Sequence, residues 1–241
     1  MYTHALDPVL FSVGPFTAYW YGLVYALGFL FLYYFIPKYG LLDEGLTDNY
    51  VLTMLISMLL GSRVFTYVFW YPEQLLANPL QLFYVHQGGM SFHGAFVGMF
   101  LGTLWYCQRH EQDPYKLLGA LSIPLAFFLG VGRIANFINA ELVGTVTNVS
   151  WCVIFPPEQL CRHPYQLYAA LKNFAIIPFL YFYSFKTPKQ RFWVFVLLYS
   201  ALRVVVDVWR AEPTTAFFLS TGQLLSLATA GVATYILVQR T

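Results

Sequence analysis

Charged side chains are scarce in this sequence. Asp, Glu, Lys and Arg make up 10% of the 241 residues, against roughly a quarter in soluble domains. Because 59% of the residues are hydrophobic and 20% are aromatic, a soluble globule of this size could not hide its apolar surface. The composition therefore excludes a soluble enzyme and a disordered chain. The net charge of +2 is too small to indicate a nucleic acid as partner.

Cysteine is scarce as well. The three Cys residues include no CxxC motif, so the sequence gives no case for a metal site, and no organic cofactor is expected. Cys152 and Cys161 lie nine residues apart in a segment predicted to face the outside of the cell. A disulfide can form there because that compartment is oxidising, and two free thiols are the alternative.

Long apolar stretches, by contrast, are numerous. A transmembrane helix needs about 20 apolar residues to cross a hydrocarbon core of about 30 Å. Seven stretches approach or meet this length: residues 17–37, 50–70, 91–107, 116–139, 167–185, 191–209 and 218–238. The residues before the first stretch have no basic region and no small-residue cleavage site, so we expect no cleaved signal peptide. The predicted fold is an all-α, multi-pass membrane protein with seven helices and one domain over residues 1–241.

The distribution of Lys and Arg predicts the orientation. With the N-terminus outside, the inner loops and tail contain seven of these residues and the outer loops contain two. The inner seven are Lys38, Arg109, Lys116, Lys186, Lys189, Arg191 and Arg240; the outer two are Arg162 and Arg210. The other four fall within the stretches: Arg63, Arg133, Lys172 and Arg203. Since cytoplasmic loops are enriched in Lys and Arg, the N-terminus is predicted outside and the C-terminus inside.

Two outer segments are long enough to be structured. Residues 71–90 are partly apolar and end in a glycine turn. Residues 140–166 have β-branched runs interrupted by a Pro pair, and we expect irregular or short-strand structure there, lying on the membrane.

Charges within the apolar stretches need an explanation, because they are costly in lipid and usually face a protein or water-filled interior. Those considered are Arg63, Arg133, Arg203 and Asp207. An ion pair between helices or snorkelling to the interface could explain one isolated Arg. The three arginines, however, share a predicted depth with Tyr21 and His93, and this favours a site for an anion in the outer half of the bilayer.

Helical spacing places several of these side chains on common faces. One predicted stripe on the sixth stretch consists of Tyr199, Arg203, Asp207 and Arg210, which are three or four residues apart. Arg133 and Asn136 share a face of the fourth stretch, and Glu141 follows its outer end. Because a guanidinium can donate two parallel hydrogen bonds to phosphate, several arginines could bind a phosphodiester and stabilise charge that develops on it.

The glycine-containing segment 86–98 suggests a second part of this site. The helix predicted to follow its glycines begins with N–H groups that favour an anion. His93 lies in the first turn of that helix, and an imidazole pKa of about 6.5 suits a general base at neutral pH. The alternative is a hydrogen-bonded interface histidine. His4, His86 and His110 are interpreted as ordinary interface or loop residues.

Residues 132–144, GRIANFINAELVG, match the pattern Gly-Arg-x-x-Asn-Phe-x-Asn-x-Glu-x-x-Gly at every fixed position. In this motif the sequence resembles the prolipoprotein diacylglyceryl transferases. Similar segments cover nearly the whole chain: WYGLVYALGF (20–29), GSRVFTYVFWYPE (61–73), GGMSFHGAFVG (88–98), RHPYQLYAA (162–170), YSALRVVVDVWR (199–210) and GQLLSLATAG (222–231). The seven-span, N-outside arrangement of that family agrees with the predicted topology.

The resemblance implies a reaction and its partners. These enzymes transfer the diacylglyceryl group of phosphatidylglycerol to the thiol of the lipobox cysteine in a bacterial prolipoprotein signal peptide, the first step of lipoprotein maturation. A thioether forms and glycerol phosphate leaves. The resemblance implies a protein of the bacterial cytoplasmic (inner) membrane, surrounded by membrane lipids. We expect a monomer with its active site in the outer half of the bilayer.

The resemblance also implies site residues. By motif position these are Tyr21, His93, Arg133, Asn136, Glu141, Gly144, Tyr199 and Arg203, and two further motif arginines are Arg63 and Arg210. We expect Arg133 and Arg203 to clamp the phosphate and His93 to accept the thiol proton. Tyr21 and Tyr199 are expected to orient donor or nucleophile. Asn136, Glu141 and Gly144 are expected to shape the site, with Glu141 tethering an arginine.

The chain also departs from the family pattern. Ser62 and Ala95 replace Gly, Ala169 and Asp207 replace Glu, and the Arg-x-Pro-Asp ending is altered in residues 210–214. A catalytically inactive or donor-shifted paralogue is therefore one alternative. A small anion or organophosphate transporter is another, although the outward-displaced arginines and the lack of an evident repeat count against it.

Overall fold

A computed structural model describes residues 2–14, 16–84, 88–216 and 218–239. This part of the chain is mostly helical, which confirms the predicted helical class. Each of the seven predicted stretches corresponds to one long helix: α1 (Trp20–Lys38), α2 (Glu44–Phe69), α4 (Phe92–Arg109), α5 (Pro114–Ile138), α6 (Tyr165–Phe182), α7 (Pro188–Val206) and α8 (Thr221–Val238).

Within the described residues, five helices are long and apolar enough to cross a membrane. They are α1, α2, α5, α7 together with the short 3₁₀ helix η3 (Asp207–Trp209), and α8. The helices α4 and α6 do not meet both conditions. The count of seven spans therefore stays a prediction.

The chain forms two compact units. Unit 1 contains residues 1–28 and 118–241, and unit 2 contains residues 29–117. Each unit is described separately below.

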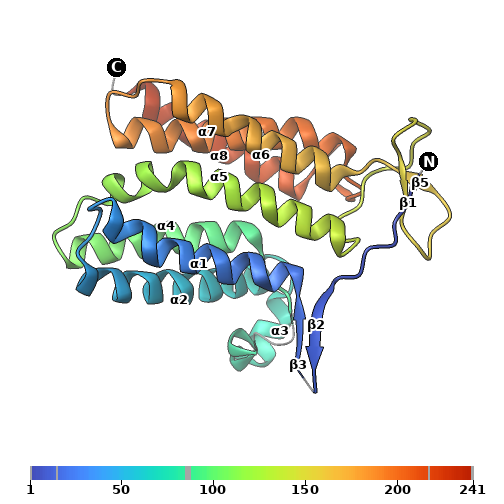
Figure 1. Cartoon of the computed structure of the whole chain (residues 1–241), viewed down its shortest axis with the longest axis horizontal. Coiled ribbons are helices and arrows are strands. Elements are labelled where there is room, and N and C mark those ends of the chain that lie inside the picture. The colour runs from blue at the N-terminus through green and yellow to red at the C-terminus, as the bar shows by residue number, and fades with distance from the viewer. Residues whose placement is uncertain (1, 15, 85–87, 217, 240–241) are drawn as a thin grey trace. The chain divides into compact units, whose positions relative to one another are not determined.

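In unit 2 the helices α2 and α4 pack side by side (Figure 1). Small residues allow their backbones to approach closely. A Cβ atom added at Gly61 would lie 2.8 Å from Cα of Gly98, and one added at Gly98 would lie 3.0 Å from Cα of Gly61. This close packing brings the second half of α2 against the first half of α4, the helix that carries His93.

The segment 71–90, which is predicted to face outward, contains helix α3 (Pro72–Ala77) and the 3₁₀ helix η1 (Pro79–Phe83). Gly88 and Gly89 have φ values of +76° and +67°, a region that favours glycine, as the predicted turn requires. Residues 85–87, which include His86, lie outside the described residues.

In unit 1 the helix α7 contacts both α6 and α8 (Figure 1). A capping box starts α8: the Ser220 hydroxyl accepts from the Gln223 amide at 3.2 Å, and Gln223 Oε1 accepts from the Ser220 amide at 3.0 Å. The side-chain nitrogen of Gln223, Nε2, donates to the Val204 carbonyl at 3.0 Å. The first turn of α8 is thereby attached to the last turn of α7.

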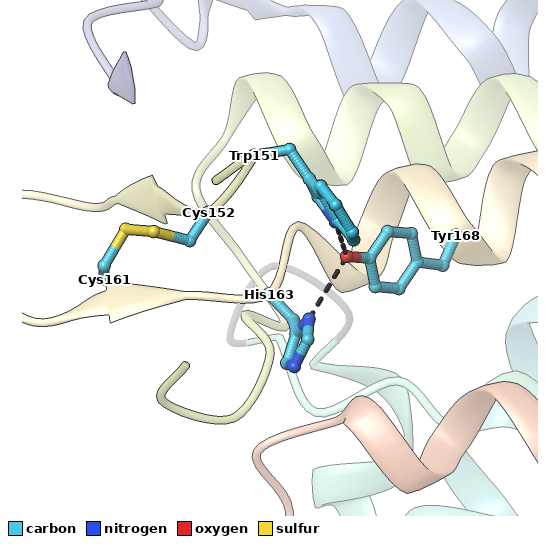
Figure 2. Close-up of a disulfide and its surroundings, with 5 residues drawn as sticks. All are labelled: Trp151, Cys152, Cys161, His163 and Tyr168. Atoms are coloured by element: carbon cyan, nitrogen blue, oxygen red, sulfur yellow. Dashed lines mark hydrogen bonds between the residues drawn. A yellow bond between two sulfur atoms is a disulfide. The ribbon is translucent and has the colours of Figure 1, made fainter. Parts of the chain in front are cut away.

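The segment 140–166, which is also predicted to face outward, contains the expected short strands. Strand β4 (Val153–Ile154) pairs antiparallel with β5 (Cys161–Arg162) and parallel with β1 (Tyr2–Thr3). A disulfide joins Cys152 to Cys161 beside this small sheet (Figure 2).

Other strands were not predicted from the sequence. They are β1 and two hairpins, β2 (Val9–Val13) with β3 (Phe16–Tyr19) and β6 (Thr214–Ala216) with β7 (Leu219–Ser220). Strands of two to five residues are too short to show a clear alternation of apolar and polar side chains.

Candidate active site

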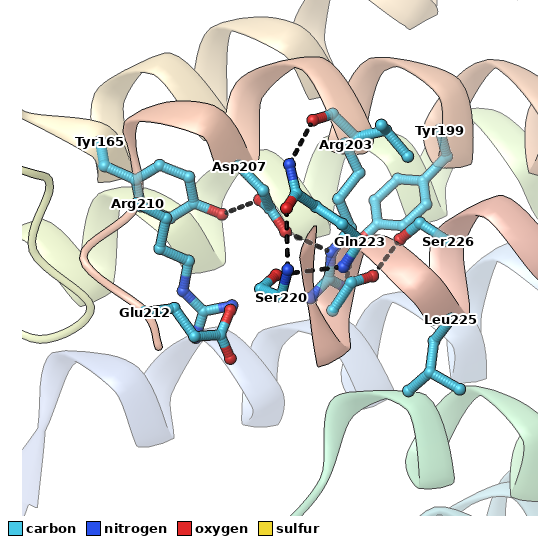
Figure 3. A network of polar contacts seen from close by, with 12 residues as sticks. Tyr165, Tyr199, Arg203, Asp207, Arg210, Glu212, Ser220, Gln223, Leu225 and Ser226 are labelled. Carbon is cyan, nitrogen blue, oxygen red and sulfur yellow. Dashed lines mark hydrogen bonds and ion pairs between the residues drawn. The ribbon is translucent and has the colours of Figure 1, made fainter. Parts of the chain in front are cut away.

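A buried ion pair marks the C-terminal end of α7. Arg203 and Asp207 are only 4% and 5% exposed, and Arg203 Nε lies 3.2 Å from Asp207 Oδ2. The other carboxylate oxygen accepts a hydrogen bond from the Tyr165 hydroxyl at 2.5 Å (Figure 3). Both oxygens of Asp207 are therefore engaged, and the carboxylate fixes one edge of the Arg203 guanidinium.

The predicted stripe is correct for its first three residues. One helical turn before Asp207, Arg203 Nη1 lies 3.5 Å from the Tyr199 hydroxyl. Arg210 does not continue the stripe, because α7 ends at Val206 and a 3₁₀ turn follows. Arg210 has extended backbone angles and pairs with Glu212 at 3.0 Å.

A series of hydrogen bonds links side chains of the motif 132–144 at the end of α5. Arg133 Nη1 donates to Asn136 Oδ1 at 3.4 Å, so these two side chains share a face as predicted. The Asn136 amide donates in turn to Glu141 Oε2 at 3.1 Å, and Asn139 donates to Glu141 Oε1 at 3.2 Å. Glu141 is therefore linked to Arg133 through Asn136 and not by a direct ion pair, since no described arginine forms one with it.

The loop after α5 has an unusual backbone. Ala140 and Leu142, on either side of Glu141, have φ values of +53° and +54°, a left-handed conformation that costs L-residues about 1–2 kcal/mol. The Glu141 amide donates to the Asn136 carbonyl at 2.9 Å, which closes the helix end. Gln166 of α6 donates to the Glu141 carbonyl at 2.6 Å. These contacts fix the position of Glu141 beside Asn136.

Gly144 permits a backbone pairing between the ends of α5 and α7. The Thr145 amide donates to the Trp209 carbonyl at 2.9 Å, and the Ala211 amide donates to the Val143 carbonyl at 3.1 Å. Between these bonds Gly144 pairs with Arg210. A Cβ atom at Gly144 would lie 2.8 Å from the Trp209 carbonyl oxygen and would also meet the carbonyl of His163. Only glycine fits here, because both of these carbonyl oxygens belong to the backbone and cannot move aside as a flexible side chain would.

Tyr21, in the first turn of α1, belongs to the same unit. Its hydroxyl lies 3.1 Å from the hydroxyl of Tyr25. The two rings meet edge to face, with 5.2 Å between their centroids. Tyr21 is therefore paired with a second tyrosine that the sequence did not indicate.

His93 lies in the first turn of α4, as predicted. The Ser91 hydroxyl caps this helix by accepting from the Gly94 amide at 3.4 Å. The imidazole stacks on Phe65 of α2, with 6.3 Å between ring centroids. The position of His93 is thus set by the helix start and by an aromatic ring of the neighbouring helix.

Arg63, which is 1% exposed, contacts groups of unit 2 itself. Its guanidinium donates to the carbonyls of Gln81 and Gly88 and lies 4.7 Å from the centroid of the Tyr67 ring. Arg63 therefore attaches α2 to the segment that leads into α4. Contact between Arg63 and a substrate stays a prediction, as does the convergence of Arg63 and His93 with the arginines of unit 1.

One known protein family matches nearly the whole chain. The family model described as prolipoprotein diacylglyceryl transferase matches residues 8–239. The chain belongs to the prolipoprotein diacylglyceryl transferase family. Together with its apolar helices, this membership makes it an integral membrane protein and a transferase.

Three relatives, each named phosphatidylglycerol–prolipoprotein diacylglyceryl transferase, illustrate the similarity. The protein of Pseudomonas entomophila is 37% identical over 91% of this chain and 86% of its own length. That of Wolbachia pipientis is 35% identical over 92% and 90%. That of Rickettsia bellii is 32% identical over 97% and 95%.

Three further residues of this transferase-family site were not assigned from the sequence. Tyr165 hydrogen-bonds Asp207, and a Cβ atom at Gly222 of α8 would lie 3.1 Å from Arg203 Nη2. Lys172 of α6 lies with its Nζ 3.8 Å from the centroid of the Tyr199 ring. Of these three residues, only Lys172 could have been noticed in the sequence, as a charge within an apolar stretch. The other two depend on packing between helices that are distant in sequence.

The ion pair at the end of α7 yields a stability prediction for this member of the transferase family. Asp207→Asn should lower the free energy of unfolding by about 3–5 kcal/mol, because Arg203 would remain buried without its counterion. Reversible unfolding in detergent micelles measures this change.

A matched control is the exposed pair of Arg162 with Glu158, which has the same spacing and a Glu158 side chain that is 47% exposed. Glu158→Gln should cost less than about 1 kcal/mol. Equal, small losses in both variants would contradict a structural role for the Arg203–Asp207 pair.

Proposed function

We propose that this protein transfers the diacylglyceryl group of phosphatidylglycerol to the lipobox cysteine of prolipoproteins, acting as a monomer. The family match over residues 8–239 supports the reaction, and the names of the relatives contain both substrates. The site assignment depends on one observation in unit 1. Backbone pairing at Gly144 joins the end of α5, which bears Arg133, to the end of α7, which bears Arg203.

The reaction needs a thiolate and a stabilised leaving group. A cysteine thiol has a pKa of about 8.5 and must lose its proton before it attacks carbon. The sulfur forms a bond to the glyceryl carbon that carries the phosphate, and the bond between that carbon and the phosphate oxygen breaks. The electron pair remains on the oxygen, so glycerol phosphate leaves with additional negative charge.

Arg133 and Arg203 bind this phosphate in our proposal. Their guanidinium groups are held before substrate arrives, Arg203 by Asp207 and Arg133 by Asn136. Donors that are fixed in advance stabilise developing charge without reorganisation. Tyr199, next to Arg203, and Tyr21 orient the donor or the nucleophile, and His93 accepts the thiol proton.

We place the protein in the bacterial inner membrane with seven spans, the N-terminus outside and the active site in the outer half of the bilayer. The distribution of Lys and Arg supports this orientation. The helices α4 and α6 each have 18 residues, enough for about 27 Å. Several polar residues that lower their hydropathy are buried in protein, among them Thr103, Lys172 and Asn173.

Reporter fusions test the spans. Alkaline phosphatase, which is active only outside the cytoplasm, should be inactive when fused after Gln112 and active when fused after Glu158. Activity after Gln112 would show that α4 does not cross the membrane and would contradict the seven-span topology.

Variants of the two arginines test the function. With phosphatidylglycerol and a lipobox peptide, wild-type protein should produce a gel shift of the peptide. Arg133→Ala and Arg203→Ala should each lower the rate about 100-fold or more, the range found when one charge-stabilising donor is removed. Arg109→Ala, at the exposed end of α4, is the matched control and should retain the wild-type rate.

Two results would oppose the proposal. Near-normal turnover by Arg133→Ala or Arg203→Ala would refute the phosphate clamp. No shift with wild-type protein across several anionic lipids would refute the transferase function and favour an inactive paralogue.

A further inference from the structure

Lys172 is a buried cation in the middle of α6. It is only 7% exposed. Its Nζ donates to Asn173 Oδ1 at 2.8 Å and lies 3.8 Å from the centroid of the Tyr199 ring. A lysine in this position is costly in an apolar helix, so the contacts that compensate for its charge matter.

The acidic side chains nearby are already engaged. Asp207 pairs with Arg203 and Glu212 pairs with Arg210. Among the described residues, no carboxylate lies within 4.0 Å of Lys172 Nζ or of the Arg133 guanidinium. The positive charges of Arg133 and Arg203 are nevertheless near enough to interact with the ammonium group of Lys172. The cluster therefore holds two cations without a carboxylate partner, an arrangement that an anionic ligand would stabilise.

Tyr199 joins this lysine to Arg203. Lys172 lies over the ring of Tyr199, while the Arg203 guanidinium lies 3.5 Å from its hydroxyl. One aromatic side chain thus separates and orients two cations from two helices. Helix α6 contains no Asp or Glu, and its residue one turn before Lys172 is the buried Ala169. The helix itself therefore supplies no counterion.

We propose that Lys172 binds the phosphate of the donor lipid together with Arg133 and Arg203, and that it selects an anionic over a zwitterionic headgroup. The cluster attracts the phosphate and repels the ammonium group of a zwitterionic lipid such as phosphatidylethanolamine. This inference rests on the proposed function.

Lys172→Met is the direct test, because methionine has a similar length without the charge. The KM for phosphatidylglycerol should rise about tenfold, as expected for a lost charged hydrogen bond, and by more than kcat falls. Phosphatidylethanolamine should compete better against phosphatidylglycerol in this variant than in the wild type. Lys172→Arg should recover most of the affinity, and Lys186→Met, at an exposed loop position, should behave as wild type.

Thermal unfolding in detergent separates binding from a structural role. The midpoint of Lys172→Met should equal or exceed that of the wild type, because a desolvated charge has been removed. An unchanged KM together with a lower midpoint would show that Lys172 serves the fold alone, and it would overturn the inference.

A binding measurement keeps this inference distinct from the proposed function. Micelles containing phosphatidylglycerol should raise the unfolding midpoint of the wild type more than micelles containing phosphatidylethanolamine. Lys172→Met should lose that difference, even if wild-type protein modified no peptide and the proposed function failed. Equal lipid-dependent shifts in wild type and Lys172→Met would refute the role of Lys172.

Discussion

The backbone pairing of residues 143–145 with residues 209–211 is the constraint on which the candidate site depends. It joins the end of α5, which carries Arg133, to the end of α7, which carries Arg203. The pairing is possible because Gly144 has no Cβ, so that the carbonyls of His163 and Trp209 can approach it. Two polar chains then extend from this junction, one from Glu141 through Asn136 to Arg133 and one from Tyr165 through Asp207 to Arg203. A single glycine therefore determines where two guanidinium groups can lie relative to each other.

The few charges of this protein are arranged so that attraction for an anion remains after the internal pairs have formed. Asp207 and Glu212 compensate Arg203 and Arg210, whereas Arg133 and Lys172 have no described carboxylate partner. In lipid such cations are stable only with polar neighbours or a ligand. The buried pair also orients Arg203, so in the proposed mechanism the same carboxylate that stabilises the fold also positions the guanidinium for phosphate. Under this proposal one set of contacts supplies both stability and binding.

Sequence patterns predicted the parts of the structure that depend on local periodicity. Long apolar runs identified the seven long helices, and spacing of four residues predicted the contacts of Arg203 with Tyr199 and Asp207. Arg210 was misplaced because no Gly or Pro marks the end of α7 at Val206; the first Pro is Pro213. The pairing of β1 with β4 and the bond from Tyr165 to Asp207 join segments far apart in sequence. Such contacts depend on tertiary packing, which a single sequence does not encode in any local pattern.

The most direct test of this account compares two glycines of one motif, residues 132–144. Gly132 has open space around its Cβ position, whereas a Cβ at Gly144 would collide with backbone atoms. The measurement is the initial rate of lipobox-peptide modification by Gly132→Ala and Gly144→Ala, purified in folded form at equal concentration. We expect a rate within about twofold of wild type for Gly132→Ala. For Gly144→Ala we expect a loss of about 100-fold, because displacement of a catalytic group by about 1 Å has that effect. A wild-type rate for folded Gly144→Ala would contradict the claim that this pairing positions the arginines.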